Sequence, residues 1–101
     1  LTGTIASQTL EKYYVDFTFI SCKGIDREKG IMESNDSEGR IKSVMIRQAR
    51  KAVLLIDHSK FDRTAFVKCD DFSHIDTLVT DEKPSSEWQS YLADNHINLI
   101  F

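Results

Sequence analysis

The sequence predicts an α/β fold in which a mostly parallel β-sheet carries helices on both faces. Segments rich in β-branched and aromatic residues alternate along the chain with segments whose apolar residues repeat at helical spacing. Several strand-like segments are continuous apolar runs, as expected for strands of a parallel sheet that is buried on both sides. With 101 residues, of which 41% are hydrophobic, the chain is long enough for one hydrophobic core and too short for a second domain.

Three segments have helical patterns. Residues 8–14 consist of helix-forming residues, and residues 84–95 are opened by a proline, which is favoured at the first helical position. Residues 35–52 begin with Asn35, followed three residues later by Glu38, the spacing of a capping box. The apolar stripe of this helix repeats at intervals of three and four and consists of Ile41, Val44, Met45, Ala49 and Ala52.

The strand-like segments lie between these helices. Clear strands are predicted at residues 17–21, 53–56 and 97–101, a short one at 64–68, and another within 75–81. The stretch between the first strand and the second helix contains two glycines and is predicted as a loop.

Polar residues follow three of the predicted strands. In parallel sheets, ligands bind beyond the carboxyl ends of the strands, where loops and helix N-termini meet. The strand within 75–81 is followed by Thr80 and Asp81. The candidate binding residues are Lys23, Gly24 and Asp26 after the first strand, and Asp57, Ser59 and Lys60 after the second.

The sequence around Asp57 permits two interpretations. Lys60 and Ser59 could bind a phosphate or carboxylate, while Asp57 holds the loop by accepting backbone N–H groups. We expect Lys60 to be largely solvent-exposed in that case. The same residue types are also ordinary turn formers, and spacing alone favours this simpler interpretation.

The other candidates have similar alternatives. Glu38 and Lys42 are four residues apart and stabilise a helix as an ion pair whatever else they do. Lys23 and Asp26 around Gly24 form either a simple turn or a place where a ligand approaches the backbone closely.

Composition excludes several other classes of function. The net charge is −3, so these residues lack the basic excess of a nucleic-acid-binding domain. Cys22 and Cys69 have no metal-binding spacing and indicate reduced thiols in a cytoplasmic protein. The three histidines lack metal-site spacing, there is no glycine-rich phosphate loop, and no apolar run is long enough for a membrane span, so neither metal, cofactor nor membrane is predicted.

Several segments occur in a characteristic order: DFTFISCKGID, GIMESNDSEGRIKSVMI, VLLIDHSKFDRTAFVK, IDTLVTDEKPSSEWQSYL and INLIF. In this order, and above all in DHSKF at 57–61 and IDTLVTD at 75–81, the chain resembles the C-terminal effector domain of DeoR-family transcriptional repressors over roughly residues 14–101. The resemblance implies a fold like those of ribose phosphate isomerase and glucosamine phosphate deaminase. It also implies that residues 1–101 are a fragment of an effector-binding domain, incomplete at the N-terminus.

The resemblance further implies what the domain does. It would sense a phosphorylated sugar, form a homo-oligomer, and contact operator DNA only through a winged helix-turn-helix domain outside these residues. The residues that would border the effector pocket are Lys23, Gly24, Asp26, Glu38, Lys42, Asp57, Ser59 and Lys60.

Two departures from the isomerase pattern bear on function. Related isomerases carry an acid near Lys23 and a catalytic glutamate near Lys42, so the lysines remove plausible proton-transfer groups and no catalytic residue is expected. The segment LTGTIASQTL resembles a phosphate loop around Thr2, Gly3 and Thr4, but it joins EKYY early, through either a true deletion or a missing loop. A fragment of an isomerase-like or deaminase-like enzyme, and an oligomerisation module without ligand, stay as alternatives.

Overall fold

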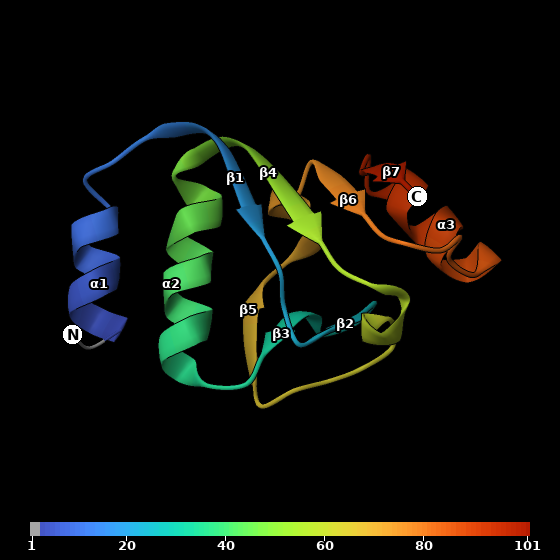
Figure 1. Cartoon of the computed structure of the whole chain (residues 1–101), viewed down its shortest axis with the longest axis horizontal. Coiled ribbons are helices and arrows are strands. Elements are labelled where there is room, and N and C mark those ends of the chain that lie inside the picture. Colours follow the sequence, from blue (N-terminus) through green and yellow to red (C-terminus); the bar gives the residue numbers. More distant parts are fainter. Residues whose placement is uncertain (1–2) are drawn as a thin grey trace.

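The structure, a computed structural model, describes residues 3–101 and contains a parallel sheet of four strands. β1 (Val15–Ile20) and β7 (Asn98–Ile100) are its edges, and β4 (Ala49–Leu55) and β6 (Thr77–Val79) lie between them in the order β1-β4-β6-β7 (Figure 1). All three pairings in this sheet are parallel. The predicted α/β class with a parallel sheet is therefore confirmed.

A second, antiparallel sheet takes two of its three strands from the region predicted as a loop. β2 (Gly24–Asp26) and β3 (Gly30–Glu33) form a hairpin, and β5 (Val67–Asp70) pairs with β3. Gly30 has a φ of +90°, a conformation open to glycine but strained for other residues, and it starts the return strand of the hairpin. β2 and β3 were predicted as loop, because three and four residues show no clear alternation, whereas β5 overlaps the short strand predicted at 64–68.

Three α-helices complete the fold: α1 (Gly3–Leu10), α2 (Asp36–Arg47) and α3 (Ser86–Asp94). The Asn35 side chain caps α2 by accepting the backbone N–H of Glu38 at 2.8 Å, as the capping spacing predicted. α1 ends at Leu10, before most of the predicted segment 8–14, and α2 ends at Arg47 rather than at residue 52. Residues 49–52, whose alanines fitted the helical spacing, belong instead to β4 and pair with β1.

The hydrophobic core lies on one face of the parallel sheet. Ile20, Leu54 and Leu78 are register partners across β1, β4 and β6, and all three are buried. Ile46 of α2 and Trp88 of α3 belong to the same buried cluster, so both helices cover this face. The antiparallel sheet contributes further members to the same core, namely Ile25, Ile31 and Cys69.

The opposite face of the parallel sheet has no helix over it in the part of the chain that the structure describes. Phe17 and Phe19 of β1 are 55% and 61% exposed, and Leu55 and Ile100 are also exposed. α1 lies beside α2 rather than over this face (Figure 1). In residues 3–101 the helices α2 and α3 lie on the core side of the parallel sheet.

The three α-helices of residues 3–101 have 8, 12 and 9 residues. None of them is long and apolar enough to cross a bilayer.

Candidate functional site

The parallel pairing brings three strand ends together at one edge of the sheet. β1, β4 and β6 are neighbours that run in the same direction, so the residues after Ile20, Leu55 and Val79 emerge side by side. This is the edge where ligands collect in parallel sheets. Most of the residues that the sequence singled out lie in these three connections.

After β4, the chain forms a tight turn held by Asp57. Asp57 Oδ1 accepts the backbone N–H of Ser59 at 2.8 Å and also the Ser59 hydroxyl, while Oδ2 accepts the Lys60 ammonium at 3.2 Å. The turn itself is a single 3₁₀ helix, η1 (His58–Lys60). The two bonds from Ser59 and the bond from Lys60 lower the pKa of Asp57 to about 2. Asp57 therefore holds the loop through a backbone N–H, as predicted.

Lys60 differs from its expected environment. Only 26% of its side chain is exposed, so the prediction of a largely solvent-exposed lysine is wrong. The cause is local, because both Asp57 and Ser59 draw the ammonium back onto the turn. The acceptor carboxylate is itself half exposed, so an anion arriving from solvent can reach the pair.

His58 connects this turn to the connection that follows β6. Its backbone N–H donates to Asp81 Oδ1 at 2.7 Å, and its ring Nδ1 lies 3.0 Å from Asp81 Oδ2 and 2.9 Å from Glu82 Oε2. The hydrogen bond to Asp81, followed by the charge of Glu82, raises the pKa of His58. These three side chains also place their ligand atoms within 4.8 Å of one another, so they are the group among the described residues that could hold a metal ion.

A second ion pair, between Lys42 and Glu33, lies beside the end of β1. Lys42 of α2 donates to Glu33 Oε2 at 2.6 Å and to the backbone carbonyl of Ser21 at 2.8 Å. The side chain of Glu33 is 1% exposed, and its other oxygen accepts the N–H of Ser34 at 2.9 Å. Burial alone would raise the pKa of Glu33, but the bonds from Lys42 and Ser34 outweigh it and hold the pKa below its ordinary value.

The Cys22 thiol is buried just beyond the end of β1. Burial raises the pKa of the Cys22 thiol to about 11, while Lys42 and Lys60 both act in the opposite direction. Lys42 reaches the end of β1 directly, since its ammonium donates to the backbone carbonyl of Ser21 at 2.8 Å.

The hairpin is fitted closely against the residues that follow η1. A Cβ atom added to Gly24 would lie 2.1 Å from the backbone oxygen of Arg63, so no larger residue fits without movement. Ile25 forms a parallel bridge with Phe61, and its carbonyl accepts the N–H of Arg63 at 3.2 Å. Gly24 therefore has a packing function that holds the hairpin beside the turn.

The far end of the turn is anchored by α3. The rings of Phe61 and Trp88 meet edge to face with centroids 5.1 Å apart, and the Trp88 indole N–H donates to Asp62 Oδ1 at 2.9 Å. Asp62 adopts a φ of +59°, which is uncommon for a residue with a side chain. Both ends of the 57–62 segment are consequently fixed by hydrogen bonds.

The remaining candidates are Lys23, Asp26 and Glu38. Lys23 donates its backbone N–H to Met32, and its side chain is exposed. Asp26 caps the hairpin turn by accepting the N–H groups of Glu28 and Lys29, and it lies on the side of Tyr91, so its role is that of a turn residue. Glu38 is exposed and its carboxylate is 4.0 Å from Lys42.

Part of the predicted phosphate loop lies outside the described residues. This is the case for Thr2, whereas Gly3 and Thr4 belong to the first turn of α1. The segment Gly3–Leu10 is helical, which differs from the glycine-containing phosphate loop that the resemblance suggested.

Two residues of this edge were not identified from the sequence. Glu33 lies in a short strand that was predicted as a loop, and its burial depends on a lysine from another element. The contact of His58 with Asp81 joins residues 23 positions apart, although both flank predicted strand ends. The sequence offered one indication of that contact, because both residues follow predicted strands whose ends should meet at the same edge of a parallel sheet.

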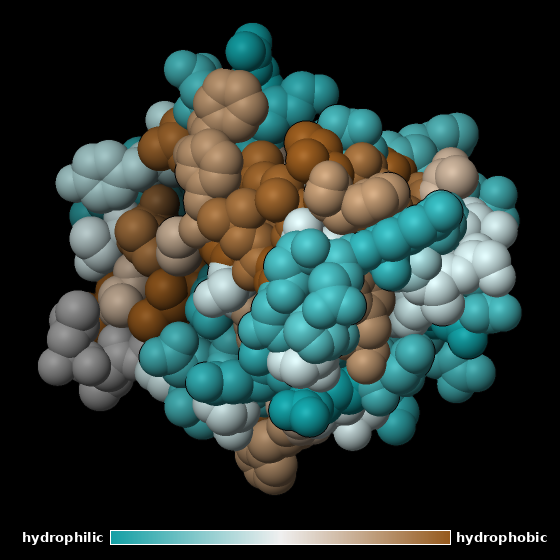
Figure 2. Space-filling model, turned by 45° about the vertical axis from the view of Figure 1, so that its right-hand side comes forward, coloured by the Kyte–Doolittle hydropathy of each residue, from teal (hydrophilic) through white to brown (hydrophobic). Residues whose placement is uncertain are grey.

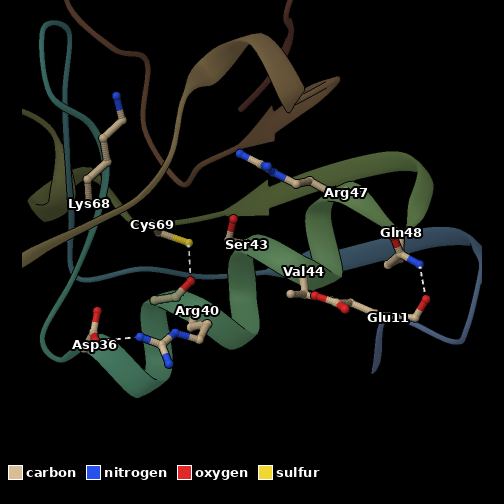
Figure 3. A pocket seen from close by; sticks show the side chains of 10 residues that line it. Glu11, Asp36, Arg40, Ser43, Val44, Arg47, Gln48, Lys68 and Cys69 are labelled. Atoms are coloured by element: carbon tan, nitrogen blue, oxygen red, sulfur yellow. Dashed lines mark hydrogen bonds and ion pairs between the residues drawn. The ribbon is translucent and has the colours of Figure 1, made fainter. Parts of the chain in front are cut away.

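A separate hollow of about 560 Å³ runs along α2 (Figure 3). Figure 3 shows Ser43 and Arg47 of α2 facing the side on which Lys68 of β5 lies. Each cation of this groove has an acidic partner: Arg40 binds Asp36 at 2.9 Å, Arg47 binds the buried Asp70 at 3.4 Å, and Lys68 binds Asp71. The groove therefore carries little unbalanced positive charge, which makes it a poorer anion site than the edge of the sheet.

Comparison with known proteins gives a consistent result. Residues 1–82 match the family described as the DeoR C terminal sensor domain. The chain is 33% identical over 98 residues to an L-fucose operon activator of Haemophilus influenzae, covering 97% of this chain and 39% of the relative. It is 34% identical over 100 residues to the glycerol-3-phosphate regulon repressor of Escherichia coli, covering 96% of this chain and 40% of the relative.

A third relative is the deoxyribose operon repressor of Escherichia coli, which is 32% identical over 94 residues, covering 93% of this chain and 37% of the relative. The chain thus spans about two fifths of the length of these proteins.

Proposed function

Because the chain belongs to the DeoR C-terminal sensor domain family, we propose that it binds a phosphorylated sugar at the carboxyl edge of the parallel sheet. The observation that carries this proposal is the position of Lys60, in a turn directly after β4, with its ammonium on a half-exposed carboxylate. A phosphate can replace that carboxylate as the acceptor of the lysine, because it offers more negative charge and more oxygens.

Lys42 and Lys60 would have different tasks in such a site. The contact of Lys42 with the buried Glu33 is short and enclosed, so exchanging it for a ligand would leave a buried carboxylate without its partner. The contact of Lys60 with Asp57 is longer and open to solvent, so it can be exchanged at little cost. We assign phosphate binding to Lys60 and Ser59, and positioning of the β1 end to Lys42.

The names of the relatives support the choice of ligand. They are regulators of fucose, glycerol-3-phosphate and deoxyribose genes, so each is connected with a sugar or a phosphorylated three-carbon compound. In this proposal the domain works in the cytoplasm as the sensor of a transcriptional regulator. Operator DNA would be contacted by another part of the protein, since the net charge of these 101 residues is −3.

The protonation states of the carboxylates at this edge of the sheet fit a binding role better than a catalytic role. An isomerase needs a carboxylate that accepts a proton near neutral pH. The pKa of Asp57 is about 2 and that of Glu33 is held below its ordinary value by Lys42, so both carboxylates are weak bases. We therefore propose a sensor rather than an enzyme.

The proposal is tested by measuring thermal stability and binding heat with a panel of phosphorylated sugars and their unphosphorylated counterparts. The expected result is that at least one phosphorylated sugar raises Tm and that Lys60→Ala weakens its binding by roughly 10- to 150-fold, the value of one charge-assisted contact. The matched control is Lys12→Ala, which removes the same charge from an exposed position after α1. Equal affinity of Lys60→Ala and the parent chain would contradict the assignment.

A further inference from the structure

Three side chains of metal-ligating type meet where the turn after β4 contacts the connection that follows β6. The Nδ1 atom of His58 lies 3.0 Å from Asp81 Oδ2 and 2.9 Å from Glu82 Oε2. The ligand atoms of all three side chains lie within 4.8 Å of one another. We call these three residues the His58 cluster.

Hydrogen bonding alone does not satisfy the His58 cluster. An imidazole Nδ1 carries at most one proton, so it can donate one hydrogen bond. Two carboxylate oxygens, one from Asp81 and one from Glu82, nevertheless lie at hydrogen-bond distance from this one nitrogen. One proton shared by two acceptors leaves each bond bent and weak, while the two negative charges repel each other. A metal ion in the place of that proton would bind all three atoms at once.

The spacing of the three ligand atoms fits a divalent metal ion. Bonds from imidazole nitrogen and carboxylate oxygen to such an ion are about 2.0–2.2 Å long. Neighbouring ligand atoms are then about 3.0 Å apart in octahedral geometry and about 3.4 Å apart in tetrahedral geometry. The two separations from His58 Nδ1, 3.0 and 2.9 Å, are close to both values. Each side chain is at least half exposed, so a small adjustment costs no core packing.

The ligand Asp81 is already oriented by bonds from outside the three ligand atoms. Its Oδ1 accepts the backbone N–H of His58 at 2.7 Å and the Thr80 hydroxyl at 3.4 Å, while Oδ2 faces the ring. Outer hydrogen bonds of this kind hold ligands in position in metal sites. The parallel pairing of β4 with β6 fixes the two segments from which the ligands come. The side chain of Asp81 therefore needs little reorganisation to bind an ion.

Charge and access also favour a cation. With a neutral imidazole, the cluster has two negatively charged carboxylates and no positive charge. The neighbouring ammonium of Lys60 is bound to Asp57 at 3.2 Å, so its charge is balanced within the turn. Figure 2 brings forward the side of the molecule on which α3 lies in Figure 1, and shows hydrophilic side chains projecting there into solvent.

We propose that His58, Asp81 and Glu82 bind a divalent transition-metal ion, with water completing its coordination. One imidazole and two carboxylates suit Zn²⁺ and Mn²⁺ better than Mg²⁺ and Ca²⁺, which prefer oxygen ligands alone. Zn²⁺ should bind more tightly than Mn²⁺, following the usual order of affinities. The ion joins the turn after β4 to the end of β6 and so holds the turn in which Lys60 lies. Histidine spacing gives no indication of this site, because its ligands come from segments 23 residues apart.

The test is isothermal titration calorimetry of the 101-residue chain with Zn²⁺ and with Mn²⁺, in the absence of any sugar phosphate. The expected result is one ion per chain with a dissociation constant in the micromolar range. Mn²⁺ has little preference for thiols, so binding of this ion separates the cluster from the two cysteines. Because no effector is present, the result is independent of whether the chain binds a sugar phosphate.

Two substitutions remove ligands one at a time. His58→Ala deletes the ring but keeps the backbone N–H that holds Asp81, and Glu82→Gln keeps the side-chain volume without the charge. Each should weaken binding of Mn²⁺ by about tenfold or more, since losing even an outer-shell partner costs 10- to 100-fold in metal affinity. A urea melt of each variant in the absence of metal shows whether it is folded.

His96→Asn is the matched control. It removes another exposed imidazole, at a φ of +58°, a conformation that asparagine also adopts. It should leave metal binding unchanged. A parent chain that binds neither ion at millimolar concentration would overturn the proposal. So would equal affinity in the parent, His58→Ala and Glu82→Gln, or a loss of binding in His96→Asn.

Discussion

The contact between Lys42 and Glu33 gives the sharpest prediction for stability. Replacing Lys42 by methionine keeps most of the side-chain volume but leaves the Glu33 carboxylate, which is 1% exposed, without its cation. Removing one partner of a buried ion pair costs about 3–5 kcal/mol of unfolding free energy. We expect about 3 kcal/mol, the lower end, because Ser34 still donates its N–H and hydroxyl to Glu33.

The pH dependence gives this prediction a second readout. In the parent chain the pKa of Glu33 is below its ordinary value of 4.5, so the pair contributes stability above the unfolded pKa and loses it as pH falls through the folded pKa. In Lys42→Met, burial becomes the dominant effect and raises the folded pKa above the unfolded one. The sign then reverses, and the cost of the substitution should grow as pH rises from about 4 to about 7.

Urea melts at several pH values measure both effects. The double variant Lys42→Met with Glu33→Gln should recover most of the loss, since it removes the buried charge along with its partner. Glu38→Gln is the control, because its carboxylate is exposed and 4.0 Å from the same ammonium, and it should change stability by less than about 0.5 kcal/mol. A cost below about 1 kcal/mol with an unchanged pH profile in Lys42→Met would refute the reasoning.

Two further substitutions test other contacts of the edge. The pKa of His58 is raised above its ordinary value of 6.5, so the stabilisation from its contact with Asp81 is fully present below the unfolded pKa. This stabilisation is lost as pH rises through the folded pKa. In urea melts, the difference in unfolding free energy between the parent chain and His58→Ala should therefore shrink over that pH range. Gly24→Ala should destabilise by more than about 1 kcal/mol, because the new methyl group meets a backbone oxygen at 2.1 Å. Gly39→Ala in α2 is the comparison, since its methyl group meets a Val67 side chain at 3.2 Å and gains helix propensity, so the change should stay within about 1 kcal/mol. Equal losses at the two glycines would contradict this explanation.

The features that sequence predicted correctly are those fixed by neighbours along the chain. The cap of α2 joins Asn35 and Glu38, and the turn after β4 joins Asp57 and Ser59, so the residue types alone specify the contacts. The parallel sheet was predicted because buried strands keep their apolar character whatever packs on them. The end of α2 was misplaced because Ala52 fits both the helical spacing and a buried strand position.

The features that sequence missed depend on contacts between distant elements. The burial of Glu33 is possible only because Lys42 reaches it from α2, and the link between His58 and Asp81 requires β4 and β6 to be neighbours. A lysine near a glutamate in sequence does not by itself show that the pair is enclosed. The same reasoning applies to the exposed apolar side chains of the parallel sheet, such as Phe17 and Phe19, because an apolar strand does not specify which element packs on it.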